Sequence, residues 1–153
     1  MCIRDRRRGN AREALKIAEE AFEIAPQSPA AALILGRAQL ASGMTDDAIA
    51  TLTQLAQRHP QSADTQLQLA LAYGQKQDAE RARRALNRVL ELQPGHPLAT
   101  LGLGNLALRT GKLDEALGIA RELQKSQPDS PAGLALEGDV HICLLYTSDA
   151  ADE

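Results

Sequence analysis

The sequence predicts an all-α solenoid built from antiparallel helix pairs, and three observations support this fold class. The same residue types recur every 34 positions between residues 9 and 141, without an insertion or a deletion. Each period carries the start and stop signals of two helices. Aromatic residues make up 2% of the chain, so the core must consist mainly of alanine and leucine, which suits close helix packing better than a sheet. One helix pair cannot bury both of its faces, and the pairs are therefore expected to stack.

The period is visible in several separate columns of residues. Proline, alanine, a further small residue and leucine each occupy one column, and glycine occupies another at a turn. These columns are Pro26, Pro60, Pro94 and Pro128; Ala14, Ala48, Ala82 and Ala116; Gly36, Ala70, Gly104 and Gly138; Leu35, Leu69 and Leu103, with Glu137 as the exception; and Gly9, Gly43 and Gly111, with Gln77 as the exception. We expect the alanine and small-residue columns to let the two helices of a pair approach closely.

Residues 29–62 show how each period forms two helices. Ser28 followed by Pro29 is typical of an N-cap and a first helical position. The first helix is expected to end at Gly43. The second is expected to run from about Thr45 to Arg58, because the residue before a proline is pushed out of the helical region. The later periods repeat these signals with Ser62, Ser130, Pro97 and Pro131, and the space between pairs is expected to be filled by Leu52, Leu55, Leu86, Val89 and Leu123.

The period divides the chain into three complete repeats flanked by two partial ones. Residues 9–28 correspond to the second helix of a truncated repeat, residues 29–62, 63–96 and 97–130 to complete repeats, and residues 131–141 to the first helix of another truncated repeat. This arrangement predicts that the chain is a fragment of a longer array.

The segments 1–6 and 143–153 fall outside the repeat and resemble translated sequencing adaptor. One DNA segment, translated on opposite strands, can encode both MCIRD at the start and CLLYT near the end. Such scars are set aside in fold reasoning. A helix could run on into them by propensity alone, but we do not expect them to pack in register with the array. Both cysteines, Cys2 and Cys143, lie in these segments, so no disulfide, thiol nucleophile or cysteine metal site is expected.

Between these segments, the pattern resembles the tetratricopeptide repeat (TPR) family over residues 9–141. The matching features are the Leu-Gly pairs at Leu35-Gly36 and Leu103-Gly104, together with the glycine, alanine and proline columns. The family's early aromatic residue is replaced by Ala32, Gln66, Thr100 and Leu134, and its later tyrosine survives only as Tyr73. The resemblance implies a right-handed superhelix whose concave side is lined by the first helices of the pairs.

A shorter stretch, Leu-Glu-Gly-Asp-Val at residues 136–140, looks like a variant found in long bacterial TPR arrays of exopolysaccharide export systems with PEP-CTERM sorting. This second resemblance implies the bacterial cell envelope, and therefore the periplasm, with a cytoplasmic location left open.

Neither composition nor motifs indicate catalysis, a cofactor or a metal. The net charge of -3 provides no basic excess for nucleic acid, and no apolar run approaches the roughly 20 residues that span a bilayer. No nucleotide-binding or metal-binding motif occurs. His59 and His96 each precede a proline at a helix end, where we expect a cation to complement the helix dipole. The acidic pairs Asp46-Asp47 and Asp114-Glu115 begin second helices, and the dipole explains them better than acid–base catalysis does.

The densest basic patch is a stripe of Arg81, Arg84 and Arg88, with Arg83 nearby. Two interpretations remain open for it. The stripe is either a solvated outer face supported by Glu80 and Glu91, or a contact for an acidic patch of a partner. Interleaved aromatic residues, on which the bases of a nucleic acid would stack, are absent.

The TPR resemblance places the candidate partner-binding surface on the concave side of the first helices. Spacings of four and three keep a set of residues on one side of a helix, opposite the Leu-Gly packing row, and a row of leucines suggests an apolar groove. The candidate residues are Leu33, Arg37, Leu40, Leu67, Leu71, Leu98, Leu101, Asn105, Leu108 and Arg109. Leu33, Leu67 and Leu101 share one repeat position and are expected to be exposed at the centre. The alternative is that neighbouring turns of a longer array cover them.

The sequence thus predicts a non-catalytic scaffold that mediates protein–protein interaction. An amphipathic protein or peptide segment would lay its apolar side chains on the leucine row, while Arg37, Asn105 and Arg109 fix its register. Carboxylate-clamp members of the family use Lys and Asn on this surface, and the prevalence of leucine argues against such a clamp here. The alternative function is a regulatory or substrate-recruiting array of a larger enzyme whose catalytic domain is missing from the fragment.

Overall fold

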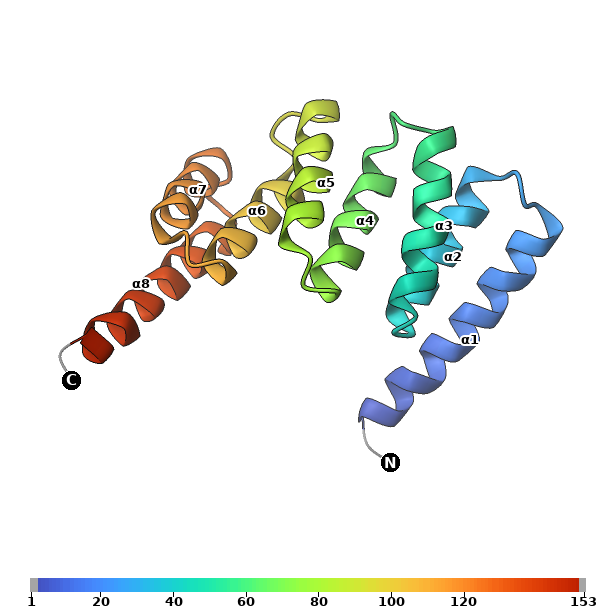
Figure 1. Cartoon of the computed structure of the whole chain (residues 1–153), viewed down its shortest axis with the longest axis horizontal. Coiled ribbons are helices and arrows are strands. Elements are labelled where there is room, and N and C mark those ends of the chain that lie inside the picture. The colour runs from blue at the N-terminus through green and yellow to red at the C-terminus, as the bar shows by residue number, and fades with distance from the viewer. Residues whose placement is uncertain (1–2, 152–153) are drawn as a thin grey trace. The chain divides into compact units, whose positions relative to one another are not determined.

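The computed structural model describes the backbone of residues 3–151 and the side chains of residues 9–146. Helices are the regular structure of this part, and no strand occurs in it (Figure 1). The helices are α1 (Ile3–Ile24), α2 (Pro29–Ala41), α3 (Thr45–Arg58), α4 (Ala63–Gln75), α5 (Ala79–Leu92), α6 (Pro97–Arg109), α7 (Leu113–Ser126) and α8 (Ala132–Ala151). They form two compact units, residues 1–85 and 86–153, with the boundary inside α5. The all-α solenoid predicted from the repeat is confirmed.

The first helices of the pairs begin at side-chain caps that recur with the period. Ser28 accepts a hydrogen bond from the backbone N–H of Ala31, and Ser62 accepts one from Thr65, both at 3.3 Å. Each cap satisfies one of the N–H groups that a helix start leaves without an intrahelical partner. The caps predicted at these two serines are therefore confirmed.

His96 occupies the position that serine holds in the neighbouring repeats, and it caps α6 in the same way. Its Nδ1 accepts a hydrogen bond from the backbone N–H of Ala99 at 3.3 Å. The expectation of a dipole-complementing cation at His96 was wrong, because Pro97 begins a helix here and does not follow one.

The turns between the helices of a pair use the left-handed backbone region. Gly43 and Gly111 have φ values of +79° and +73°, and Gln77 adopts +59° at the same repeat position. A residue with a Cβ is disfavoured in this region. Gly9 departs from its column, because α1 runs through it as continuous helix.

The first unit packs its helices in sequence order, α1 on α2, α2 on α3 and α3 on α4. Ala18 of α1 is buried with Leu35 and Ala38 of α2. Gly36 lies so close to α3 that a Cβ built on it would be 2.6 Å from Cδ2 of Leu52. The close approach predicted for this glycine and its second helix is therefore present.

The second unit packs α6 on α7 and α7 on α8. A Cβ built on Gly104 would collide with Leu136 of α8 and lie 3.1 Å from Ile119 of α7. Leu136 is itself buried with Ala120 and Leu123. The small-residue column thus serves two contacts in this unit, one within the pair and one with the next first helix.

Glu137 stands where the other repeats have a leucine, and a polar clamp accommodates it. Gln124 of α7 donates a hydrogen bond of 2.7 Å to its carboxylate, and Arg121 Nε lies 3.6 Å from the other oxygen. The hydrogen bond from Gln124, followed by the charge of Arg121, holds the pKa of Glu137 below its ordinary value. Gln124 and Arg121 therefore satisfy the polar side chain that replaces leucine at this repeat position.

The first and last helices, α1 and α8, differ from the sequence-based prediction in their length and in which of their residues are buried. Ala14 and Gly138, which belong to the small-residue columns, are exposed, whereas Ala18 is 1% exposed because α2 packs on it. Helix α8 runs on past residue 141 to Ala151, and Leu144, Leu145 and Tyr146 are exposed on it. The segments 1–2 and 152–153 of the adaptor-like ends lie outside the described residues.

Candidate protein-binding surface

Each first helix presents one exposed stripe, and its residues recur at the same repeat positions. On α2 the stripe consists of Ala30, Ile34, Arg37 and Ala41, all of them exposed. On α4 the equivalent residues are Asp64, Gln68, Leu71 and Gln75, of which Gln68 is half-buried. Spacings of four, three and four place each set on one side of its helix. The opposite side of each helix carries the packing row that begins with Leu35 and Leu69.

We call the surface formed by the stripes of α2 and α4 the α2–α4 face. It carries large aliphatic side chains at Ile34 and Leu71, together with one positive charge at Arg37 and one negative charge at Asp64. The two helices are in contact. Ile34 is 51% exposed and Leu71 is 53% exposed, and the exposed Arg37 lies on the same stripe as Ile34. Large aliphatic side chains at this exposure on adjacent helices are typical of a surface that contacts another protein.

The structure divides the candidate residues of the first unit into three groups. Arg37 and Leu71 are exposed, and Leu33 and Leu67 are half-buried. Leu40 is only 7% exposed, so it belongs to the core and not to a binding surface. The reason is its spacing, because Leu40 follows Gly36 by four residues and therefore shares the packing side of the helix.

The candidate residues of the second unit divide in a similar way. Leu98 is 59% exposed, and Asn105 and Arg109 are exposed on the same side of α6. Leu101 and Leu108 are half-buried and pack against the cluster of Ala120, Leu123 and Leu136. The expectation that the position shared by Leu33, Leu67 and Leu101 is fully exposed was therefore too simple, since each of these leucines is half-buried.

Sequence reasoning missed Ile34, which is the exposed aliphatic residue of α2. It lies within Leu33-Ile34-Leu35, where three aliphatic residues in a row conceal which one points outward. The helical spacing from Arg37 was the available signal, because a residue three positions before an exposed arginine shares its side of the helix.

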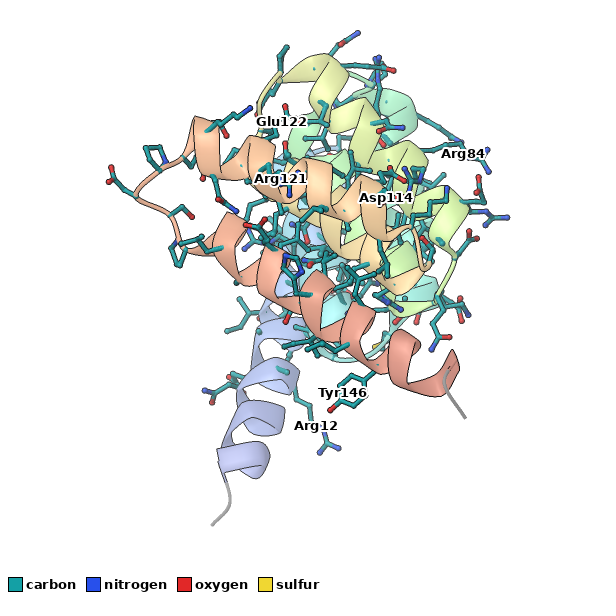
Figure 2. The ribbon with its side chains drawn as sticks, turned by 90° about the vertical axis from the view of Figure 1, so that its left-hand side faces the viewer. Arg12, Arg84, Asp114, Arg121, Glu122 and Tyr146 are labelled. Carbon is teal, nitrogen blue, oxygen red and sulfur yellow. The ribbon has the colours of Figure 1, made fainter. Side chains whose placement is uncertain are left out.

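The basic stripe on α5 is partly paired with acidic residues near the two ends of this helix. Arg81 Nε lies 3.2 Å from the carboxylate of Asp78, and Arg88 lies 2.8 Å from Glu91. The support predicted from Glu91 is present, whereas Asp78 takes the place expected of Glu80. Arg84 extends away from its helix (Figure 2). Among the described residues, no carboxylate pairs with it.

The described residues contain no cluster of three His, Cys, Asp or Glu side chains suited to a metal ion. No helix within residues 3–151 is both long enough and apolar enough to cross a bilayer.

Comparison with known proteins places these features in a family. Two family models, both described as tetratricopeptide repeat, match residues 6–72 and 67–131. Among curated protein sequences no significant match is found.

Solved structures show the same fold at low sequence identity. A thermophilic TPR protein of Thermus thermophilus is 22% identical, with a TM-score of 0.76, and the alignment covers 89% of this chain and 75% of that one. A TPR protein of Parabacteroides merdae is 21% identical, with a TM-score of 0.81 and coverages of 96% and 57%. The MamA protein is 20% identical, with a TM-score of 0.75 and coverages of 97% and 81%. With repeat models matched across residues 6–131 and this shared fold, the chain belongs to the tetratricopeptide repeat family.

Proposed function

We propose that this chain is a non-catalytic scaffold that binds an amphipathic segment of a partner protein on the exposed stripes of its first helices. TPR repeats generally mediate protein–protein interaction, and this proposal names the surface. The observation that carries it is the exposure of two large aliphatic residues, Ile34 and Leu71, on two helices in contact, each more than half exposed.

The chemistry of the α2–α4 face favours a segment with apolar anchors. Covering a half-exposed aliphatic side chain removes apolar area from water and stabilises a complex in proportion to that area. The half-buried Leu33 and Leu67 add apolar surface beside the two exposed residues. Arg37 supplies one charge-assisted contact that can fix the register of the bound segment. In the second unit, Leu98, Asn105 and Arg109 offer the same combination on α6.

Selection from a displayed peptide library provides the test, because the partner is unidentified. Peptides of about 15 residues selected on the wild-type protein should carry apolar residues at helical spacing. Leu71→Asp should then weaken the binding of a selected peptide by about 10- to 100-fold, which corresponds to about 1.4–2.8 kcal/mol. Fluorescence anisotropy of a labelled peptide measures the change.

Ile17→Asp is the matched control for this substitution. Ile17 is 57% exposed in the middle of α1, so it introduces the same charge at the same exposure outside the α2–α4 face. Circular dichroism should show both variants folded. Equal binding by the Leu71→Asp variant and the wild type would reject the α2–α4 face as the site. Equal weakening of binding by Leu71→Asp and Ile17→Asp would show that the added negative charge, and not the position of Leu71, causes the loss.

A further inference from the structure

A second surface of the first unit lies between the second helices α3 and α5, over the side of α4 that carries Tyr73. It is a pocket of about 350 Å³. Its floor is apolar, formed by Leu69 and Ala85, and its rim carries Thr53, Gln66 and Tyr73, together with two arginines of α5. These two are Arg81 and Arg84, so the lining of the pocket combines two positive charges with neutral hydrogen-bonding groups.

This pocket is separate from the α2–α4 face. On α4 the pocket residues Gln66, Leu69 and Tyr73 follow one another at spacings of three and four. Gln68 and Leu71 of the α2–α4 face fall on the other side of the same helix, since a helix turns by about 100° per residue. A ligand in the pocket therefore does not compete for the same side chains.

One of the two arginines is held in place before any ligand arrives. The guanidinium of Arg81 lies over the ring of Tyr73, 5.7 Å from its centroid, and its Nε pairs with Asp78 at 3.2 Å. Asp78 uses its other carboxylate oxygen to accept the backbone N–H of Arg81 at 3.0 Å. Both carboxylate oxygens of Asp78 are thus engaged, and the Arg81 side chain is ordered in advance, which lowers the entropy lost on binding.

The charge of the pocket is therefore unbalanced. Asp78 offsets Arg81, whereas Arg84 has no carboxylate partner among the described residues. The chain as a whole carries a net charge of -3, so it does not attract polyanions generally, and a positive pocket on it selects an acidic group locally. A guanidinium binds a carboxylate through two parallel hydrogen bonds, and the hydroxyl and amide groups of the rim can donate to the same group.

We propose that this pocket binds the carboxylate side chain of an acidic peptide segment in a partner protein. Arg84 is the principal contact, and Arg81, held over the ring of Tyr73, lines the pocket beside it. The apolar floor at Leu69 and Ala85 receives the methylene groups of a glutamate side chain. The surface is a second contact of the scaffold and acts independently of the α2–α4 face.

The test compares two fluorescein-labelled peptides, one with four glutamates in a Gly-Ser background and one with four glutamines at the same positions. At low ionic strength, where exposed charges are least screened, the glutamate peptide should bind and the glutamine peptide should not. Arg84→Ala should weaken binding of the glutamate peptide by 10-fold or more. Arg84→Lys should restore only part of it, because lysine keeps the charge without the two-pronged geometry.

Arg12→Ala is the matched control, because it removes one exposed arginine of α1, outside both surfaces, and changes net charge equally. It should alter the affinity of the glutamate peptide by less than 2-fold, while Leu71→Asp should leave that affinity within the same limit. Equal losses for Arg12→Ala and Arg84→Ala would overturn the proposal, as would equal binding of the two peptides. A phosphoserine peptide that binds while the glutamate peptide does not would also overturn it, in favour of a phosphopeptide ligand.

Discussion

At the scale of single residues, Gln77 marks a strained turn that the repeat itself identifies. Its φ of +59° matches the glycines at the same position in the neighbouring repeats, but its Cβ makes this region unfavourable by about 1–2 kcal/mol. Gln77→Gly should raise the free energy of unfolding by about 0.5–1 kcal/mol, after the greater flexibility of glycine in the unfolded chain is subtracted. Urea denaturation measures this change. The reverse substitution, Gly111→Gln, should lower stability, and a stabilising effect there would contradict the explanation.

The cap formed by His96 gives a second prediction at the same scale. His96→Ala removes the acceptor for the Ala99 N–H and should lower the free energy of unfolding by about 0.5–2 kcal/mol. His96→Ser should recover most of this loss, because serine caps the equivalent helix at Ser62. Thermal or urea unfolding of the three proteins distinguishes the cases. If the alanine and serine variants were equally stable, the hydrogen bond from Ala99 would contribute nothing.

At the scale of helices, the alanine column tests how closely the two helices of a pair approach. Ala48 is fully buried, whereas Ala50 on the same helix is exposed. Ala48→Leu should lower the free energy of unfolding by about 1–3 kcal/mol, because the added side chain has no space between α2 and α3. Ala50→Leu serves as the control and should change stability little. Comparable losses in both variants, measured by urea denaturation, would show that close packing is not the cause.

The helices and their ends were largely predictable because the signals are local and repeated. Ser28-Pro29 and the proline column set the bounds of α2 and α3 in agreement with the structure. Helical spacing alone did not predict which residues are buried at the edge of the packing side of a helix. Leu33, Leu67 and Leu101 share one repeat position and are all half-buried, and how far a neighbouring helix covers such a position depends on tertiary packing that periodicity does not contain.

The candidate site was less predictable than the fold for the same reason. The leucines of a first helix serve both the core and the surface, and Leu101 was placed on the surface although it packs against Leu123 and Leu136. The pocket at Tyr73 depends on three helices meeting. The sequence showed the arginines of α5 but not the ring on which Arg81 lies.

At the scale of the whole molecule, a repeat array is stabilised by contacts between neighbouring helices, so outer helices should open most readily. In the first unit, α1 contacts α2 and leaves Ile17 and Ile24 exposed, whereas α2 and α3 each pack between two neighbours. In the second unit, α8 packs on α6 and α7 but exposes Leu134 and Ile142, whereas α7 exposes none of its large hydrophobic residues. Amide hydrogen exchange should therefore be faster in α1 than in α2 and α3, and faster in α8 than in α7.

The buried Ala18 and Val140 should lie in the slowest-exchanging turns of their outer helices, because these turns hold the contact with the adjacent helix. Mass spectrometry of overlapping peptides resolves these differences, and uniform exchange along each unit would contradict a nearest-neighbour array in favour of a single cooperative core.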